Sequence, residues 1–259
     1  MSFSRVLVLL ASSMALFGAV GNDTFHWSGK VPPGQLIEVR GINGSIHAAP
    51  ALGNDVDVIA YKNGELYDAS NIEVRVVEHE GGVTICAVYP TANGADDCLP
   101  GAAGRRNALN NDVSVDFVVH VPKGVRFVAR TVNGLVEAKS LDADAEAHTV
   151  NGNVLLSTAG AGQGETVNGS IFASVGKFTS PLKFSTVNGG ITLEMPRDTA
   201  AKVHADTVNG AIQTDFRLPV RGQFPGKHVD GDIGHGGPDL RIATVNGAIH
   251  LRRGARRNF

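Results

Sequence analysis

Short runs of alternating apolar and polar residues recur along the chain and predict an all-β protein. Those in the first half have the two-residue period of strands with one buried face. They span residues 36–40, 56–61, 72–79, 83–89 and 113–121. The two runs on either side of Glu80-Gly81-Gly82 form the best candidate for a hairpin. The polar, glycine-rich stretch 90–111 predicts a long surface loop.

A tetrapeptide, Thr-Val-Asn-Gly, recurs six times in the second half, each time with Ile or Val two residues after the glycine. A weaker copy, His228-Val229-Asp230-Gly231, lies in the widest gap, and Gly41-Ile42-Asn43-Gly44 lies far upstream. With the weaker copy included, successive copies in the second half are 16 to 21 residues apart. The Asn or Asp positions of the eight copies are Asn43, Asn133, Asn151, Asn168, Asn188, Asn209, Asp230 and Asn246.

Two architectures use such a repeat. In an antiparallel meander, each Asn-Gly is a type I′ hairpin turn. In a parallel β-solenoid, each copy belongs to one coil, and equivalent positions of successive coils lie about 4.8 Å apart. Stacking then places like residues on like, and the side chains at the eight Asn or Asp positions form a structural ladder of hydrogen bonds. We favour the solenoid because a hairpin requires only the Asn-Gly, and we keep the antiparallel meander as the alternative.

The two-residue period predicts which side chains of the repeat face inward. The valine of the tetrapeptide shares parity with the Ile or Val after the glycine, so we expect both columns in the core. Threonine and asparagine are then exposed, and their rows are a candidate binding surface. The glycine allows the backbone to approach the next coil closely.

The chain divides into four segments. Residues 1–21 read as a signal peptide, in which Arg5 precedes an apolar stretch and Ala19 and Gly21 suit cleavage. Residues 22–125 form an N-terminal β region with irregular coils that caps the solenoid. The regular solenoid with seven copies spans 126–251, and 252–259 is a basic tail.

The expected location follows from the signal peptide. We expect an exported protein, periplasmic or extracellular, with an uncleaved membrane anchor as the alternative. No later stretch is apolar for long enough to cross a bilayer, so the mature chain should have no membrane span. In an oxidising compartment Cys86 and Cys98 are expected to form a disulfide, and the alternative is two reduced, buried thiols.

The last strand, 248–251, is expected to lie at the open end of the solenoid. Its unpaired edge would invite pairing with another chain. The basic tail follows directly, and its charges would discourage that pairing or contact an anionic envelope polymer. The charges belong to Arg252, Arg253, Arg256 and Arg257.

Composition and charge narrow the function. The net charge of −2 and the pI near 6.5 give no electrostatic reason to bind nucleic acid or an anionic membrane. Aromatic residues make up only 6% of the chain, so stacking surfaces for sugars are few. Neither a nucleophile elbow nor a phosphate-binding loop is present in the sequence.

Two groups of residues are candidates for metal binding or catalysis. The first is a cluster of His and Asp residues between positions 228 and 239 that could offer metal ligands. Its neighbouring glycines indicate a polar turn, so we expect no metal and no cofactor. Asp206 and Glu165 precede threonine in two copies and are expected about two coils, or about 10 Å, apart, which is too far for a catalytic pair. We therefore expect no enzyme. The residues of the cluster are His228, Asp230, Asp232, His235 and Asp239.

The chain resembles a family of bacterial exported proteins that carry the putative-adhesin domain of unknown function, related to the head GIN domain of putative autotransporter adhesins. The resemblance rests on the Thr-Val-Asn-Gly copies, on Arg40-Gly41-Ile42-Asn43-Gly44 and on the turn Gly234-His235-Gly236-Gly237-Pro238. It covers nearly the whole chain after the signal peptide and implies a right-handed parallel β-solenoid.

The expected function is therefore that of a non-enzymatic, exported β-solenoid, an adhesin-like binding or scaffold module of the bacterial cell envelope. Its partner would be an envelope protein or polymer. The alternative is an envelope-stress accessory protein that modulates a membrane signalling partner. A polysaccharide-acting enzyme is the third interpretation.

Overall fold

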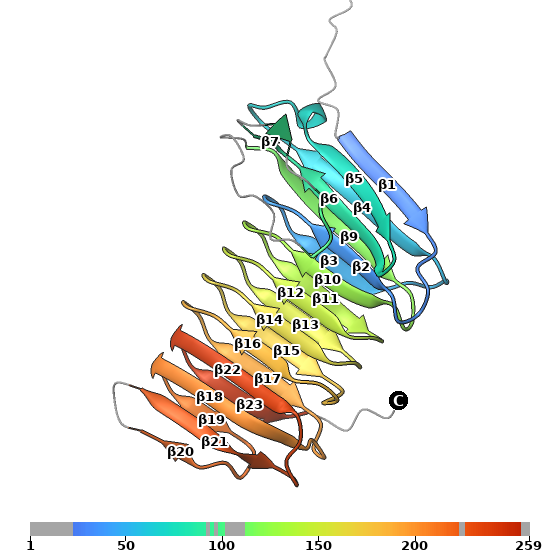
Figure 1. Ribbon diagram of the computed structural model, residues 1–259. Helices are drawn as coiled ribbons and strands as arrows, with labels where there is room; N and C mark the ends of the chain where they lie inside the picture. The colour runs from blue at the N-terminus through green and yellow to red at the C-terminus, as the bar shows by residue number, and fades with distance from the viewer. Residues whose placement is uncertain (1–22, 92–93, 96–97, 102–111, 223–225, 255–259) are drawn as a thin grey trace, which may run out of the picture.

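The computed structural model describes residues 23–91, 94–95, 98–101, 112–222 and 226–254. The predicted signal peptide and the tail beyond Gly254, with Arg256 and Arg257, lie outside the described residues. The described chain is all β apart from one short 3-10 helix. A 10-stranded sheet, called sheet A, and an 11-stranded sheet, called sheet B, form an elongated two-layer stack (Figure 1).

In the middle of the stack the chain alternates between the two sheets. The sheet B strands are β10 (Arg126–Arg130), β12 (Ala145–His148), β14 (Gly162–Glu165) and β16 (Leu182–Ser185). The sheet A strands are β11 (Val136–Leu141), β13 (Val154–Thr158), β15 (Ile171–Val175) and β17 (Ile191–Met195). Neighbours in each sheet pair in parallel. The two largely parallel sheets agree with a β-solenoid-like fold, and the antiparallel meander is wrong for this part.

The side chains that face each other across the core in the middle of the stack differ in size. The first core position after each corner in sheet A is a β-branched residue that is 0% exposed in β11, β13, β15 and β17. In sheet B, β12 and β14 have small core residues: Ala145 and Ala147 on β12, and Gly162 and Gly164 on β14. A methyl group at Gly162 would lie only 2.5 Å from the Val175 side chain. At β12 and β14 the sheets can therefore pack closely, because large side chains of sheet A face small residues of sheet B.

The N-terminal part covers one end of the stack. The coil of β2 (Leu36–Arg40) and β3 (Ile46–Pro50) pairs in parallel with β10 and β11. β1 and strands that follow β3 build the cap, with β6 beside β2 and β9 beside β3. The cap consists of β1 (Asp23–Gly29), β4 (Val56–Asn63), η1 (Ala69–Asn71), β5 (Glu73–His79), β6 (Gly82–Val88), β7 (Pro90–Thr91), β8 (Gly94–Ala95) and β9 (Ser114–Val121).

The strands predicted in this region are all present. β5 and β6 pair antiparallel from His79 and Gly82 outward, which confirms the predicted hairpin. The sequence reading missed β1, which pairs antiparallel with β4 and forms the edge of sheet A.

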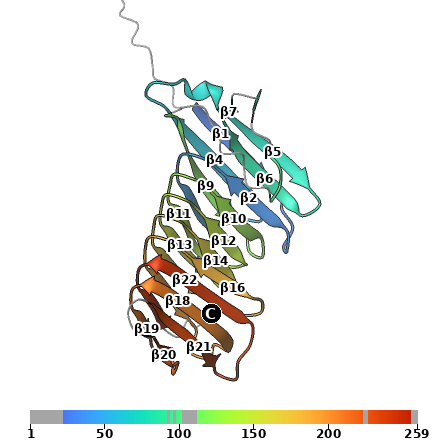
Figure 2. The same cartoon turned by 60° about the vertical axis from the view of Figure 1, so that its left-hand side comes forward.

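The other end has an unexpected strand order. The final strands, β22 (Asp239–Asn246) and β23 (Ile249–Arg253), do not end the stack. β22 lies between β16 and β18 (Ala201–Asn209), and β23 lies between β17 and β19 (Ile212–Thr214). Beyond β18, sheet B ends with β21 (Lys227–Ile233) and β20 (Val220–Arg221), which pair antiparallel (Figure 2).

This order corrects the expectation that 248–251 form an unpaired edge. β23 has a parallel neighbour on each side. Arg252 lies opposite Glu194 of β17, and the Arg253 guanidinium lies 5.1 Å from the centre of the Phe216 ring. Both arginines therefore belong to the folded stack and not to a tail. At this end of the stack the edge strands are the short β19 and β20, and short edge strands limit pairing with other chains.

Candidate functional site

The repeated asparagines lie in one row where the chain crosses from sheet B to sheet A. From Asn133 onward, each side-chain amide donates a hydrogen bond of 2.7 to 2.8 Å to the amide oxygen of the asparagine before it in the row. The spatial order is Asn43, Asn133, Asn151, Asn168, Asn188, Asn246 and Asn209. Asn246 precedes Asn209 because β22 and β23 are inserted.

Asp230 was wrongly placed in the ladder. It lies on β21, which pairs antiparallel with β18, so its copy of the motif is not a corner of the stack. Its carboxylate contacts Nδ1 of His204 at 2.6 Å. The sequence signals this difference by His228 in place of threonine and Asp230 in place of asparagine.

A second ladder, of threonine hydroxyls, lies beneath the asparagines. Each hydroxyl donates a hydrogen bond of 2.8 to 3.0 Å to the carbonyl oxygen of the repeat glycine in the adjacent coil. This contact explains why threonine recurs. The donors are Thr131, Thr149, Thr166, Thr186, Thr207 and Thr244, and they are only 3% to 6% exposed.

The predicted faces of threonine and valine were therefore reversed. A two-residue period would place Thr149 and Val154, which are five residues apart, on opposite faces, but both are buried. The chain turns at the corner between them, and this turn breaks the period. The valines point outward beside the asparagines. Val167, Val187, Val208 and Val245 are 38% to 48% exposed, and together with the asparagine ladder they form what we call the Val–Asn row.

We expect Asn168→Ala to lower the free energy of unfolding by about 1–2 kcal/mol. The substitution removes both amide bonds of Asn168, to Asn151 and Asn188, from the middle of the row. Chemical denaturation measures the loss, and Asn54→Ala, at an exposed position outside the row, provides the control. An unchanged midpoint for Asn168→Ala would show that the ladder does not stabilise the stack.

Cys86 and Cys98 form a disulfide, with Cα atoms 5.8 Å apart. Cys86 lies on β6, and the bond fixes the segment that returns toward the cap after β8. Next to it, the Arg40 guanidinium donates a hydrogen bond of 2.5 Å to the Leu99 carbonyl oxygen. The disulfide thus stabilises the cap beside β2, where Cys86 lies opposite Arg40.

The outer face of sheet B carries a network of ionisable side chains that the sequence reading missed. Glu38 on β2 is 1% exposed and accepts hydrogen bonds from Arg130 Nε, the Thr84 hydroxyl and the Gly101 amide. Its buried charge is therefore compensated. Partners that are distant in sequence make this network, so only the pairing of strands reveals it.

The network continues across the next strands through His148. Its Nε2 and Nδ1 atoms each lie 3.5 Å from a carboxylate oxygen, of Glu146 and of Glu165 respectively. Glu165 also pairs with Lys183 on β16. Burial acts to lower the pKa of His148, but the two carboxylates outweigh it, so its pKa is raised. Contact with His148 is the largest cause of the lowered pKa values of Glu146 and Glu165, and the pKa of Glu165 falls to about 2.

These shifts predict the pH dependence of stability. The raised pKa of His148 stabilises the fold fully below its ordinary value of 6.5, and this stabilisation is lost as the pH rises through the folded-state pKa. The lowered pKa values of Glu146 and Glu165 stabilise the fold above about 4.5, and this is lost as the pH falls. We therefore expect the network to contribute most between pH 4.5 and 6.5.

Thermal unfolding over a pH series measures this dependence. His148→Gln should flatten the decline above pH 6.5 relative to the wild type, because glutamine does not titrate. His250→Gln, on the outer face of sheet A, is the matched control. Parallel curves for the wild type and His148→Gln would contradict the role of His148.

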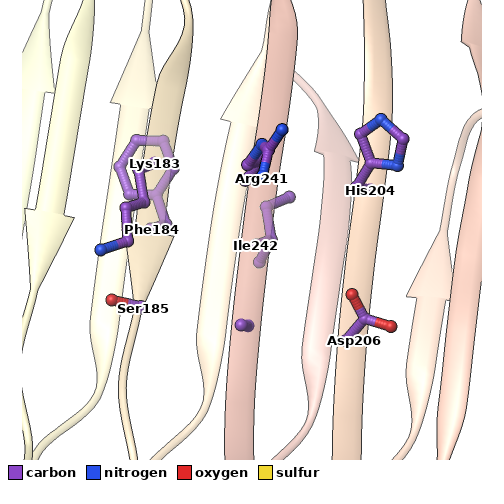
Figure 3. A pocket seen from close by; sticks show the side chains of 8 residues that line it. Lys183, Phe184, Ser185, His204, Asp206, Arg241 and Ile242 are labelled. Atoms are coloured by element: carbon purple, nitrogen blue, oxygen red, sulfur yellow. The ribbon is translucent and has the colours of Figure 1, made fainter.

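An open hollow of about 390 Å³ lies on the same face, over β16, β22 and β18 (Figure 3). Lys183, Arg241 and His204 lie opposite one another in one row. Ser185, Ala243 and Asp206 form the adjacent row. Phe184 and Ile242 are almost fully buried beneath the surface, so the strand backbones form part of the floor.

The structure distributes the candidate chemical residues over several strands of sheet B. Glu165 and Asp206 are three strands apart, not two, because β22 lies between β16 and β18. Asp230 contacts His204, and Asp232 lies opposite Lys202. Among the described residues, no group of three or more His, Cys, Asp or Glu is placed to hold a metal ion. The described residues also include no helix long and apolar enough to span a membrane.

The sequence matches no protein-family model and no curated protein. The fold is similar to solved structures of bacterial proteins described as putative adhesins. One, a putative cell adhesion protein from Clostridium sporogenes, is 10% identical, with a TM-score of 0.48 over 90% of this chain and 100% of that chain.

Two further structures are putative adhesins. The protein from Bacteroides fragilis is 11% identical, with a TM-score of 0.31 over 91% of this chain and 99% of that chain. The protein from Parabacteroides distasonis is 10% identical, with a TM-score of 0.26 over 90% of this chain and 98% of that chain. None of these TM-scores reaches 0.5.

Proposed function

We propose that this protein is a non-enzymatic, exported binding or scaffold module of the bacterial cell envelope. The observation that carries the proposal is the fixed, regular surface of the stack. The asparagine amides, threonine hydroxyls and strand backbones are hydrogen-bonded from coil to coil, so the exposed Val–Asn row and the outer sheet faces are held in place before any partner binds. A preorganised surface loses little conformational entropy on binding.

Binding is favoured over catalysis by the arrangement of charges. On the outer face of sheet B, Glu38, Glu165 and Asp230 are each in contact with a cationic or imidazole group. The separation of Glu165 and Asp206 by three strands also disfavours a pair of carboxylates acting on one bond.

Export is proposed from the charged and apolar pattern of residues 1–21, and the Cys86–Cys98 disulfide supports it, because such bonds persist in oxidising compartments. We expect the mature protein, recovered from a bacterial host, to begin near Asn22. Intact-mass measurement and N-terminal sequencing of the periplasmic and secreted fractions test this. A chain that retains residues 1–21 would contradict cleavage and favour an anchored protein.

The winding of the stack is proposed to be right-handed, as the family resemblance implies. Connections between parallel strands of one sheet are right-handed in about 98% of cases. An experimental structure would decide the hand directly.

Co-sedimentation tests the proposed function. Purified residues 22–259 are mixed with intact cells, isolated peptidoglycan and outer-membrane fractions, at low and high salt. We expect saturable binding to one of these fractions, and loss at high salt would indicate a charged contact surface. Binding to no fraction would contradict the proposal and favour a role as an accessory to a signalling protein.

A further inference from the structure

Two of the basic side chains that border the hollow on sheet B already contact carboxylates of neighbouring strands. Lys183 pairs with Glu165 on the strand before it. Nδ1 of His204 lies 2.6 Å from the Asp230 carboxylate on the strand after it. These side chains border the hollow but already have partners of opposite charge.

Asp206 and Arg241 also border the hollow, but among the described residues neither has a close partner of opposite charge. Asp206 is exposed, and its carboxylate has no hydrogen bond or ion pair within the described part of the chain. The Arg241 side chain is 70% exposed and has one long contact, 3.5 Å to Asp239. One negative and one positive group therefore face the hollow with most of their hydrogen-bonding capacity unused.

The pairing of β18 with β22 fixes how these two groups lie. Asp206 is opposite Ala243, and Arg241 precedes Ala243 by two residues, so Asp206 and Arg241 are diagonal neighbours across the small alanine (Figure 3). Diagonal neighbours in a sheet are about 7–8 Å apart. Ala243 leaves the space between them open, with the Ser185 hydroxyl on its far side.

We infer that this hollow binds the zwitterionic head group of an α-amino acid, with the ammonium on Asp206 and the carboxylate on Arg241. The ammonium and the carboxylate of an α-amino acid are attached to the same carbon. With one hydrogen bond of about 2.9 Å from the ammonium to Asp206 and one from Arg241 to the carboxylate, the head group spans this diagonal. The inference rests on the proposed function and names its ligand: the amino-acid head groups on the peptide stems of the bacterial cell wall.

The charges around the hollow argue for a zwitterion over a polyanion. Glu165, Asp230 and Asp239 already contact Lys183, His204 and Arg241, so the hollow has no surplus positive charge for a row of anionic groups. A neutral sugar would leave the Asp206 and Arg241 charges without opposite charges. Guanidinium and carboxylate groups form strong, oriented hydrogen bonds with groups of opposite charge.

The experiment compares isolated peptidoglycan with glycan strands from which the peptide stems have been removed by an amidase. We expect the protein to sediment with the former and at least about tenfold less with the latter. Free diaminopimelate, which has two zwitterionic heads, should displace it. Pimelate, which lacks the ammonium groups, and 1,5-diaminopentane, which lacks the carboxylates, should not.

Variants locate the site. Asp206→Asn and Arg241→Gln should each weaken peptidoglycan binding at least about tenfold, which corresponds to about 1.4 kcal/mol. Ala243→Phe should fill the hollow and have a similar effect without a change of charge. Asp198→Asn and Arg197→Gln make the same charge changes on an exposed turn outside the hollow and should bind normally. Thermal unfolding checks that all variants are folded.

The outcomes separate this inference from the proposed function. Equal binding of peptidoglycan by the wild type and the hollow variants would overturn the inference and leave the proposed function standing. Equal binding of peptide-free glycan would overturn it in favour of a saccharide ligand. If no envelope fraction binds, the proposed function fails. The hollow is then judged by NMR titration with diaminopimelate: shifts confined to β16, β18 and β22 would support it, and none would overturn it.

Discussion

Replacing Ile249 with aspartate should lower the free energy of unfolding by at least about 4 kcal/mol. Ile249 is 0% exposed, and β23 places it between Ile191 of β17 and Ile212 of β19. A carboxylate there would lie between two apolar neighbours within the core, where no partner compensates the loss of hydration. Chemical denaturation, followed by far-UV circular dichroism, measures the effect.

Ile212→Asp is the matched control, because Ile212 occupies the equivalent position of β19, the edge strand of sheet A. Ile212 is 6% exposed, and its strand has a paired neighbour on one side only. An aspartate at this position can therefore reach water, and it should lower the free energy of unfolding clearly less than Ile249→Asp. The reverse ranking would mean that the last strand lies at the edge and that the strand order described above is wrong.

Cross-linking tests the same strand order independently of stability. Thr192 and His250 are paired neighbours on the outer face of sheet A, whereas Gln213 is one strand further away. Thr192→Cys with His250→Cys should therefore form a disulfide, and Thr192→Cys with Gln213→Cys should not. Peptide mapping distinguishes the new bond from Cys86–Cys98.

The sequence alone could not predict the insertion of β22 and β23. The copies at Thr207 and Thr244 are the same tetrapeptide, so either could stack on the Asn188 coil with the same hydrogen bonds. The difference lies in the weaker copy. β21 pairs antiparallel with β18 over seven residues, and this hairpin occupies one side of β18. The chain must then return along the other side, between β16 and β18.

The fold class was predictable because the repeat constrains several positions at once. Like residues at equal spacing favour stacking, and the structure has parallel strands where the copies recur. The face of the valines was not predictable from a two-residue period, because the bend at the corner breaks that period. Exposure of valine and burial of threonine are set instead by the glycine carbonyl oxygens, which need a hydrogen-bond donor.

The hollow and the charged network could not be found from sequence spacing. Glu38 and Arg130 are far apart in the chain and meet because β2 pairs with β10. Arg241 and Asp206 are neighbours only because β22 is inserted beside β18. Features of this kind depend on strand order, which identical repeats leave open.

Gly169→Ala should have the second of the two largest effects, a loss of about 3 kcal/mol or more. A methyl group at this position would lie 1.9 Å from the Gly152 carbonyl oxygen in the adjacent coil. That oxygen accepts the Thr166 hydroxyl at 2.9 Å, and Asn168 is bonded to Asn151 beside it. The methyl group must therefore separate the two backbones and stretch both ladders at once.

The cost of the added methyl group is steric. The φ angle of Gly169 lies outside the left-handed region, so alanine could adopt the conformation if there were space. Gly53→Ala is the control, because its methyl group would meet no atom within 4 Å, and it should change stability by no more than about 0.5 kcal/mol. Equal denaturation midpoints for the two variants would mean that the coils are not stacked this closely. A loss larger than that of Asn168→Ala would show that close backbone contact constrains the repeat more than the amide ladder does.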